Sequence, residues 1–549
     1  MKKKLFICND ASFLSSGYGV YGKELLTRLH NSGKYEVAEL GCYAEINNSK
    51  NKSIPWKFYP NAVMNNDPRV KEYKDNPINQ FGNWRFNRAI LDFKPHIVFD
   101  VRDYWMSAYQ EISPLRRYFH WILMPTVDSS PPKIDWLFTF ANADIVVPYT
   151  DWAKQTLAKY CKSTINLFPK IANAGINPNE FYPIENKNQH KAKYFNGKTP
   201  DVIGVVMRNQ KRKLFAELMH VFRNYLNQLK NSNLMDKYNN TILYLHTSFP
   251  EENGWDLSAL LLEYGLADRV YFTYACKQCN SFFPSKFRSA ATTCKKCNNP
   301  AACFTNVSNS VSTDELNDIY NLFDIFIQYA ICEGFGMPQV EAAACGLQIA
   351  SVDYSAMTEI VESVDGIKIP VQKLFRELET NADRAYPDND FTTKLLYDFF
   401  INTSIDTRIE NSKKIRQKCL DKYTWDNVYK VWDECFESVD ITSKPDWSSK
   451  IRNETNHTSM SVPANLNPRQ FVEYVCAEII KEPYLIYTAP IQKIIKDLDS
   501  KIIAKNGVIQ GYGFPDAIKV LEYHLNNKLA CEEMRLNPAL LKNEDFLNA

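Results

Sequence analysis

Short apolar runs alternate with helical patterns along the first 150 residues. Each run of four or five mostly apolar residues is followed by a polar turn and then by a stretch with helical periodicity, such as residues 23–29. This alternation predicts a parallel sheet covered by helices. The expected strands are residues 4–8, 36–40, 96–99, 121–124 and 144–147.

The same pattern begins again after a polar segment, residues 177–200, which predicts a linker. The second set of expected strands is residues 202–207, 242–246, 270–272, 325–327 and 348–351. Open α/β sheets bind ligands at the carboxyl ends of their strands. The sequence therefore predicts two doubly wound, Rossmann-like domains facing each other across a cleft.

We expect the domain boundaries to follow these patterns. The N-terminal Rossmann-like domain is expected at 1–185, and the second at 186–400. Helices at 401–440 are expected to pack back on the core. A polar stretch, 440–467, then leads into a helical accessory segment, 441–549, with amphipathic runs at 471–480 and 517–525.

Composition excludes two classes of protein. Hydrophobic residues make up 45 % of the 549-residue chain, which is enough for large cores and excludes wholesale disorder. The longest apolar runs fall far short of the roughly 18 residues that a membrane-spanning helix needs.

The apolar run after Lys2 to Lys4 stops at Asn9, so it predicts a strand and not a signal peptide. Fourteen cysteines without a signal peptide predict a reducing cytoplasm, that of the host if a phage encodes the chain.

The net charge of +2 hides an asymmetry. Residues 1–300 hold 40 basic and 26 acidic side chains, whereas residues 301–549 hold 25 and 37. Residues 271–310 contain five basic residues and no acidic one. Such a distribution is typical of a protein with an anionic ligand or partner on its N-terminal side, and also of a dipole spread over solvated faces.

The motif with the most chemistry is residues 333–346, which read EGFGMPQVEAAACG. Two glycines permit a tight turn and close approach to a ligand, and Pro338 suits a first helical turn. A helix starting there would aim its free N–H groups at an anion or at sugar oxygens. Glu333 would lie in the loop and Glu341 about one turn into the helix, so two acceptors would be placed along one bound molecule.

A second motif lies at 275–304, inside the second domain. Its four cysteines form two C-x2-C pairs that are fourteen residues apart. Two such pairs complete a tetrahedron suited to Zn²⁺, and four thiolates leave no open position, so we expect a structural zinc ribbon; a redox dithiol pair is the alternative. Its basic residues together with Phe282, Phe283 and Phe287 resemble a nucleic-acid contact surface, although a structural flap or dimer contact would have the same composition. The expected ligands are Cys276, Cys279, Cys294 and Cys297.

The 333–341 string resembles the Glu-x7-Glu signature of glycosyltransferase family 4, which has the GT-B fold. Three other segments agree in order and spacing: residues 16–19 resemble its glycine-rich first loop, residues 173–183 its strand and loop before the linker, and residues 208–213 its Arg-x4-Lys diphosphate clamp. The resemblance covers roughly residues 1–440, apart from the ribbon. It implies that the domain at 1–185 binds the acceptor and that the domain at 186–400 binds the nucleotide-sugar. It implies a retaining transferase for a hexose or a pentose, with a nucleotide-sugar donor, expected to be a UDP-sugar, and with no catalytic metal.

The resemblance also implies residue roles. Arg208 and Lys213 would neutralise the departing diphosphate. Glu341 would accept hydrogen bonds from the ribose hydroxyls, and Glu333 would hold the transferred sugar. The remaining donor contacts would come from the two glycine-rich loops, at Gly17, Tyr18, Gly19, Gly334, Phe335, Gly336 and Met337.

One position departs from the family pattern. Many members have a His near the end of an N-terminal strand, whereas residues 125–131 here contain none. Asp128 is the nearest candidate for positioning or deprotonating the acceptor hydroxyl, and a cap of the following helix is its alternative role. His246 ends a strand of the second domain, where we favour a core imidazole over a nucleotide contact.

Two acceptors fit these motifs and this charge distribution. The leading one is 5-hydroxymethylcytosine in double-stranded DNA, as in phage-type DNA-modifying glycosyltransferases, with the basic segments following phosphates and the base flipped into the cleft. The alternative is a lipid-linked or soluble saccharide of a cell envelope. A non-catalytic module that binds nucleotide-sugars or nucleic acid fits less well, because both glutamates and the basic clamp are present.

Overall fold

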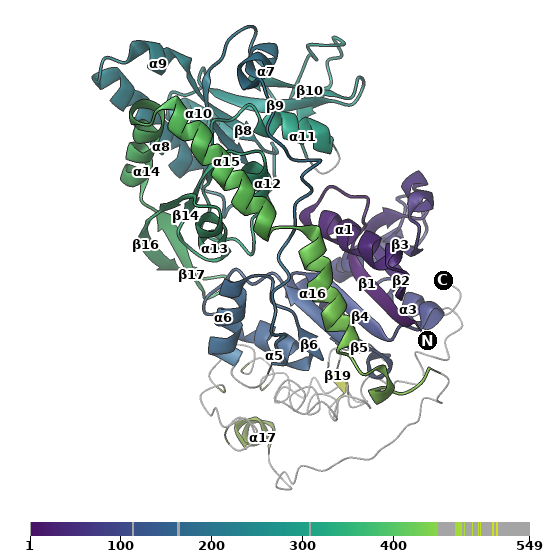
Figure 1. The fold of residues 1–549 in the computed structure, drawn as a ribbon. Helices are drawn as coiled ribbons and strands as arrows, with labels where there is room; N and C mark the ends of the chain where they lie inside the picture. Colours follow the sequence, from purple (N-terminus) through teal and green to yellow (C-terminus); the bar gives the residue numbers. More distant parts are fainter. Residues whose placement is uncertain are drawn as a thin grey trace.

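The computed structural model describes residues 2–447, apart from 112, 114, 162–164 and 307–308, together with 467–474 and the short pieces 477, 486, 492, 495, 508–509 and 512–513. Figure 1 shows two α/β lobes, with helices α15 (Ile405–Lys422) and α16 (Trp425–Glu437) running along one side of both. The mixed α/β class with parallel sheets is confirmed.

The first domain is built on a six-stranded parallel sheet in the order β3-β2-β1-β4-β5-β6. The five predicted strands of this domain are present. They are buried on both faces, with Leu5 and Ile7 in one core and Phe6 in the other, which explains their continuous apolar runs. The strands are β1 (Lys3–Asp10), β2 (Tyr35–Glu45), β3 (Lys57–Ala62), β4 (Ile97–Arg102), β5 (His120–Pro125) and β6 (Ile145–Val146).

Helices connect these strands. The predicted helix 23–29 lies within the first of them. They are α1 (Gly17–Asn31), α2 (Val70–Asp75), α3 (Phe86–Phe93), α4 (Tyr104–Glu111), α5 (Ile134–Asn142) and α6 (Asp151–Cys161).

The second domain carries the second predicted sheet, in the order β11-β12-β9-β8-β7-β13-β14-β15. Its helices are α7 (Lys187–Tyr194), α8 (Phe215–Asn231), α9 (Met235–Asn240), α10 (Leu257–Glu263), α11 (Thr313–Tyr320), α12 (Met337–Ala344), α13 (Ala356–Ser363) and α14 (Asn389–Tyr397). Its parallel strands are β7 (Asp201–Val206), β8 (Thr241–His246), β9 (Val270–Cys276), β13 (Ile325–Gln328), β14 (Gln348–Val352) and β15 (Ile367–Ile369).

The segment 177–200 is more than a linker. It contains α7, which is held to the second domain because Lys191 Nζ donates to Asp324 Oδ2 at 2.5 Å. His190 Nε2 lies 2.9 Å from Asp318 O. A short helix with few apolar residues gave no periodic signal in the sequence.

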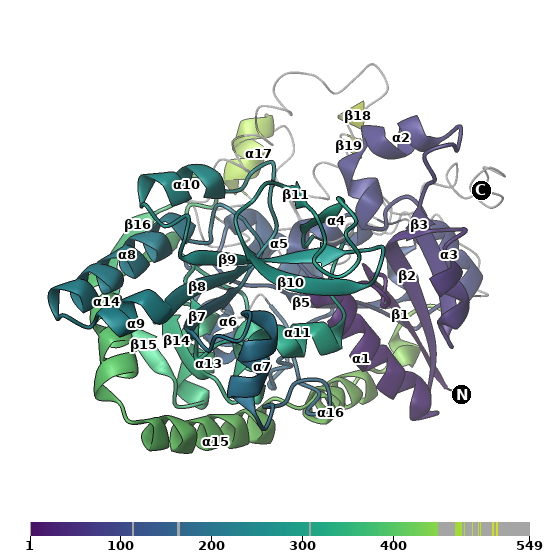
Figure 2. The same cartoon turned by 90° about the horizontal axis from the view of Figure 1, so that it is seen from above.

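The ribbon, residues 275–304, is continuous with the second sheet. Strands β10 (Ser281–Lys286) and β12 (Ala302–Phe304) both pair antiparallel with β9, and β11 (Ala291–Thr292) pairs with β12. Seen from above, β9 and β10 cross the upper side of the second domain (Figure 2). Because β9 continues four residues beyond Phe272, its last residue paired with β8, the ribbon projects from the carboxyl edge of the parallel strands.

A hairpin that the sequence did not predict joins the two domains. Strands β16 (Val371–Arg376) and β17 (Asp383–Pro387) form their own two-stranded sheet after β15. The backbone N–H of Asp383 donates to Ser130 O of the first domain at 3.0 Å. The hairpin thus reaches across the domain boundary just beyond the end of β5.

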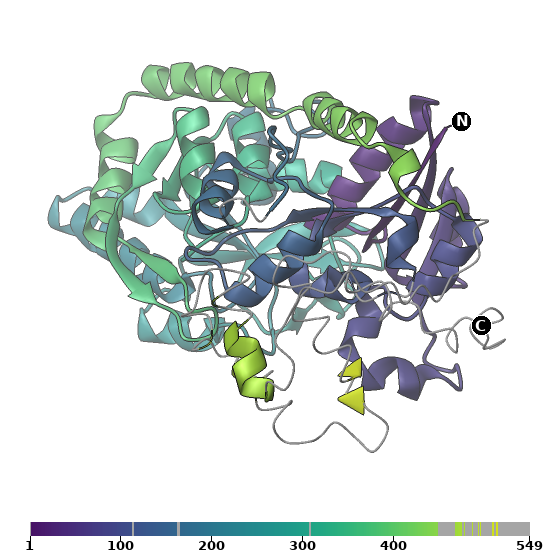
Figure 3. The same ribbon diagram turned by 90° about the horizontal axis from the view of Figure 1, so that it is seen from below.

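The helices at 401–440 return the chain to the first domain. Helix α15 packs beside α12 of the second domain, and α16 lies beside α1 (Figure 3). The Trp432 indole donates to Tyr21 OH at 2.8 Å, and Lys3 Nζ donates to Phe436 O at 2.7 Å.

Little of the expected accessory segment, 441–549, is described. The described part contains α17 (Pro468–Tyr474) and a pair of short strands, β18 (Val508–Ile509) and β19 (Tyr512–Gly513). The predicted amphipathic run at 517–525 lies outside the described residues. Among the helices that are described, none combines the length and apolar character needed to cross a membrane.

Candidate active site

The turn before α12 carries the Glu-x7-Glu motif. Gly336 adopts φ 97°, a conformation that favours glycine, and caps the helix, which begins at Met337 with Pro338 in its first turn. The helix therefore begins directly after the turn that carries Glu333, and Gln339 N donates to Gly336 O at 3.0 Å in its first turn.

Glu333 is a buried carboxylate held by two cations. Lys213 Nζ contacts one oxygen, and Arg212 Nη1 lies 2.7 Å from the other. Gln328 Nε2 also donates to the carboxylate at 2.7 Å. The backbone N–H of Glu333 donates to Ser355 Oγ at 3.0 Å, which fixes the loop.

The basic segment that supplies these cations follows β7. It is held beside the 329–331 stretch, because Leu214 N donates to Tyr329 O at 3.1 Å and Ile331 N donates to Arg212 O at 3.0 Å. Burial and the neighbouring Arg212 guanidinium lower the pKa of Lys213. The sequence motif did not single out Arg212, because Arg208 and Lys213 are the pair that its spacing indicates.

Arg208 lies apart from this cluster. Its guanidinium binds both oxygens of Glu251, at 3.1 and 3.0 Å, and its side chain is 55 % exposed. Its side chain is therefore accessible from solvent, and only an exposed ion pair would have to break for it to reach a ligand.

Glu341 lies one turn into α12, where Tyr320 OH donates to it at 2.6 Å. Burial raises the pKa of this carboxyl to about 7, and the nearby Glu180 adds to the shift. A ligand hydroxyl that hydrogen-bonds to the carboxylate would favour its charged form.

The glycine-rich loop of the first domain meets this turn. Ser16 caps α1, its Oγ accepting from Gly19 N at 3.1 Å. A Cβ added to Gly17 would lie 3.6 Å from Met337 Sδ, and a Cβ added to Gly19 would lie 2.5 Å from Leu14 O, so Gly19 has no room for a side chain. The glycine-rich loop of the first domain therefore lies next to the start of α12 in the second domain.

Tyr18 and Phe335 hold the two loops in place. The Tyr18 and Thr126 hydroxyls are 2.9 Å apart, and Thr126 in turn contacts Gly334. The Phe335 ring stacks on Tyr149 of the first domain, with centroids 4.9 Å apart. Because that ring is buried, only the backbone of Phe335 is left to contact a donor.

Asp128 lies in a cavity of about 190 Å³ between the domains. Ser129 Oγ donates to its carboxylate at 2.7 Å, and Arg384 Nη1 lies 3.4 Å from the same oxygen. The alternative role of Asp128 as a cap of the next helix is wrong, because α5 has Lys133 at its N-cap and no side-chain cap. The cavity is lined by Asp103, Tyr104, Trp105, Pro125, Thr126, Asp128, Trp136, Phe140, Thr380 and Arg384.

His246 ends β8 and is half-buried. Its Nδ1 lies 3.0 Å from Thr273 Oγ1, and burial lowers the pKa of the ring to about 4. It is therefore neutral at neutral pH.

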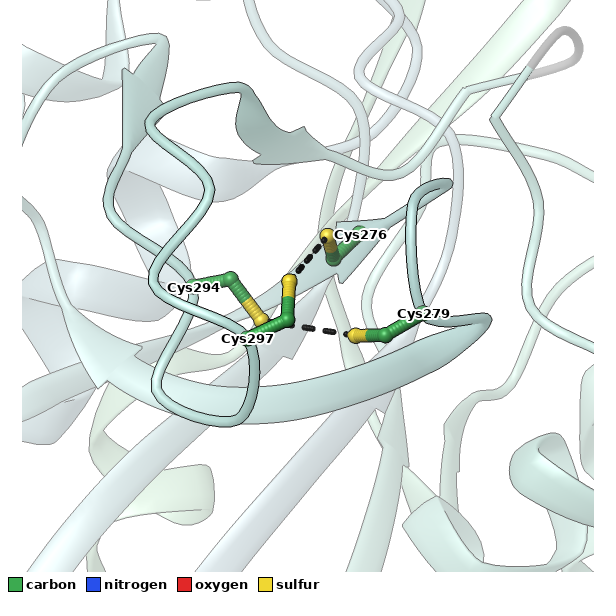
Figure 4. A group of neighbouring side chains, drawn as sticks. All are labelled: Cys276, Cys279, Cys294 and Cys297. Carbon is green, nitrogen blue, oxygen red and sulfur yellow. Dashed lines mark hydrogen bonds between the residues drawn. The ribbon is translucent and has the colours of Figure 1, made fainter.

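The four cysteines of the ribbon converge (Figure 4). All four sulfur atoms lie within 4.8 Å of one another, and Cys276 to Cys297 and Cys279 to Cys294 are each 3.6 Å apart. Four thiolates around one metal at about 2.3 Å require sulfur separations near these values. Burial raises the pKa of Cys294, but backbone N–H groups of Cys297 and Lys296 outweigh it and lower the pKa to about 6.

The ribbon surface is basic but not aromatic. Phe282 and Phe283 are buried, with Phe282 stacked on Tyr194 at 4.9 Å, and Phe287 packs between Phe249 and Phe272. The expectation that these rings form a nucleic-acid contact surface is therefore wrong, because they attach the ribbon to its domain. The exposed basic side chains are Lys277, Arg288, Lys295 and Lys296.

Comparison with known proteins agrees with this site. Residues 294–373, which include the Glu333–Glu341 turn, match the family described as "Glycosyl transferases group 1". No curated protein matches the chain in sequence.

Solved structures share the fold at low sequence identity. Sucrose-phosphate synthase from Thermosynechococcus elongatus superposes with a TM-score of 0.55 at 14 % identity, over 80 % of this chain and 100 % of the other. Anabaena HepE, in a complex with UDP and glucose, gives 0.54 at 11 % identity over 80 % and 100 %. A glycosyltransferase from Rickettsia africae gives 0.51 at 13 % over 81 % and 100 %. The fold and the match over residues 294–373 together support a glycosyltransferase with the GT-B fold.

Proposed function

We propose that this enzyme transfers a sugar from a UDP-sugar to a hydroxyl group, with retention at the anomeric carbon. The observation that carries the proposal is the contact of Glu333 with Lys213 and Arg212 at the turn facing the first domain's glycine loop. Fixed cations beside a helix N-terminus suit a departing diphosphate. The Anabaena HepE complexes with UDP and with UDP-glucose support UDP as the donor nucleotide.

The residue roles follow the resemblance, with one addition. Lys213, Arg212 and a reoriented Arg208 neutralise the diphosphate. Glu341 binds the ribose hydroxyls, and Glu333 with the backbone N–H groups of 334–337 holds the sugar. The positive charges of Lys213, Arg212 and Arg208 take the role that a catalytic metal ion would have at the diphosphate.

The proposed acceptor is 5-hydroxymethylcytosine in DNA. Four basic side chains are exposed on a ribbon that projects from the carboxyl edge of the donor sheet, and residues 271–310 contain no acid to offset them. Such a surface can follow a phosphate backbone while a flipped base enters the cleft. A saccharide acceptor is the second candidate, and the carboxylates and aromatic rings around Asp128 favour it.

The ribbon cysteines are proposed to hold one structural Zn²⁺. Sulfur separations of 3.6 Å and the closed set of four thiolates support this metal. In the part of the chain that the structure describes, the free cysteines form no disulfide bond, which agrees with a reducing cytoplasm, where we propose that the enzyme works.

Nucleoside mass spectrometry tests the reaction. Duplex DNA with and without 5-hydroxymethylcytosine is incubated with the full chain and a panel of UDP-sugars at low salt. A nucleoside heavier by one hexose or one pentose, dependent on the hydroxymethyl group, is the expected result. UDP release without a new nucleoside would exclude DNA and leave the saccharide. No binding of UDP and no UDP release would contradict the donor assignment itself.

A further inference from the structure

The cavity beside Asp128 is built by both domains. Asp103 follows β4 and Thr126 follows β5, so two neighbouring strand ends supply one wall. The hairpin β16–β17 and its turn supply Arg384 and Thr380 from the second domain. Cys332 Sγ lies 3.4 Å from Asp128 Oδ2, which places this cavity directly beside the Glu333 turn.

The two carboxylates in the cavity have different partners. Both oxygens of Asp128 are engaged, one by Ser129 and Arg384 and the other by Cys332. Arg384 is itself only 4 % exposed and fully used, because it also donates to Asp128 O at 2.8 Å and to Glu377 at 2.9 Å. This network fixes Asp128 and leaves it little capacity for a ligand.

Asp103 is held more loosely. The hydroxyl groups of Thr126 and Tyr18 act to lower the pKa of its carboxyl, and no ion pair joins it to a described residue. Burial, with Asp128 nearby, raises the pKa of its carboxyl, which suits a group that accepts a proton. The Arg212 guanidinium, which binds Glu333, lowers that pKa by a smaller amount.

The rest of the cavity is aromatic. Trp105 is 44 % exposed and packs edge-on against Phe81, with centroids 4.8 Å apart. Tyr104 and Trp136 form a second aromatic pair at 5.1 Å. The exposed Trp105 indole beside two carboxylates suits an uncharged acceptor ring. Such a ring can stack on the indole while its hydroxyl groups donate hydrogen bonds to the carboxylates.

We propose that this cavity receives the reacting end of the acceptor and that Asp103 accepts the hydrogen bond of the hydroxyl that is glycosylated. The inference rests on the proposed function. The acceptor oxygen bonds to the anomeric carbon on the face from which the diphosphate leaves, so the configuration is retained. Its proton passes to Asp103, and the diphosphate leaves with the electron pair of the broken C–O bond. Asp103 then returns the proton to water. Asp128, fixed by Arg384, is a positioning residue.

The same arrangement selects against an anionic acceptor. Asp103 and Asp128 are both acidic, and the charge of Arg384 is already met by Asp128 and Glu377. A phosphate or carboxylate next to the reacting hydroxyl would therefore be repelled. The acceptor is uncharged at that end, as a hydroxymethylated base or a neutral sugar ring is.

Asp103→Asn, Asp128→Asn and the exposed control Asp92→Asn test the inference in the full chain. UDP release is followed with the UDP-sugar that the wild type hydrolyses fastest. The probes are hydroxymethylated duplex DNA, methyl glucoside and glucose 6-phosphate. Asp103→Asn is expected to lose probe-stimulated UDP release by about 100-fold or more while keeping UDP affinity within about threefold. Asp128→Asn is expected to raise KM more than it lowers kcat, and Asp92→Asn to behave as the wild type.

Three results would overturn the inference and leave the proposed function standing. They are stimulated release by Asp103→Asn at the wild-type rate, stimulation by glucose 6-phosphate in preference to both neutral probes, and UDP binding with no stimulation by either neutral probe. A wild type that neither binds UDP nor hydrolyses any UDP-sugar would overturn the proposed function as well.

Discussion

Gly334 and Thr126 touch across the domain boundary: a Cβ added to Gly334 would lie 2.5 Å from Thr126 Cγ2. The contact involves main chain on one side and a short side chain on the other, so it cannot relax by rotating a long flexible group. It fixes the distance between the loop that carries Glu333 and the end of β5.

Gly334→Ala should therefore lower transfer about tenfold or more, because the loop must move away from the first domain. Thr126→Ser removes the methyl group and keeps the hydroxyl that contacts Tyr18, so the double variant should recover much of the activity. Steady-state kinetics of the two single variants and the double variant check this. Wild-type turnover in Gly334→Ala alone would contradict the proposed closeness of the two loops during the reaction.

Arg208 and Glu251 give a second test. If Arg208 leaves Glu251 to bind the diphosphate, Arg208→Ala should lower kcat/KM by about 100-fold with little change in Tm, since the pair is exposed. Glu251→Ala should lower kcat/KM far less, or raise it, because this substitution frees the Arg208 guanidinium. Lys211→Ala, which breaks another exposed pair in the same segment, is the control. Equal kinetics in Arg208→Ala and Lys211→Ala would reject the role of Arg208.

The Glu341 carboxyl should make stability depend on pH. Burial raises its pKa from the ordinary 4.5 to about 7. The folded protein thus keeps a proton that the unfolded chain has lost. This contribution is complete below pH 4.5 and is lost as the pH rises through about 7.

Glu341→Gln lacks this ionisation. Its stability relative to the wild type should rise by up to about 3 kcal/mol between pH 5 and pH 8. Thermal melts of both proteins across that range measure the difference, and UDP titration at pH 8 should show weaker binding by the variant. A stability difference that stays constant with pH would show that Glu341 does not titrate there.

The ribbon should contain one zinc per chain. The double variant Cys276→Ser, Cys294→Ser should lose it and melt at lower temperature, because structural sites of this kind contribute about 10–16 kcal/mol of binding free energy. Cys303→Ser is a matched control, as Cys303 lies in the same segment, outside the cluster, and accepts a hydrogen bond from Asn309 at 3.0 Å. Metal analysis of the purified wild type measures the zinc content per chain, and a content of zero would refute the ribbon assignment.

The sequence predicted the central strands because they are buried on both faces. It missed β3, where Pro60 and Asn61 interrupt the apolar pattern at a sheet edge. It also missed the hairpin β16–β17, whose first strand is mostly exposed and therefore shows no buried face. These omissions share one cause, which is that edge and surface strands leave a weak hydrophobic signal.

The site was predictable in its motifs and less so in its contacts. Short sequence motifs contain Glu333, Lys213 and the four ribbon cysteines, so the sequence alone was enough to predict them. Backbone contacts that align residues 211–214 with 329–331 place Arg212 and Lys213 on Glu333. The sequence does not show these contacts, so it gave no reason to prefer Arg212 to Arg208. Asp103 and Arg384 line the same cavity although they are about 280 residues apart in the sequence. Such a pair cannot be predicted from a local motif.

Helix α16 has a consequence for how the protein is made. Trp432 and Phe436 are fully buried against Phe99 and Tyr35 of the first domain. A ribosome must therefore synthesise more than 430 residues before the first domain can close its core. Until then, that apolar face stays open while the second domain emerges, and it is exposed to aggregation or available to a chaperone. The two halves of this enzyme thus cannot mature in the order in which they are translated.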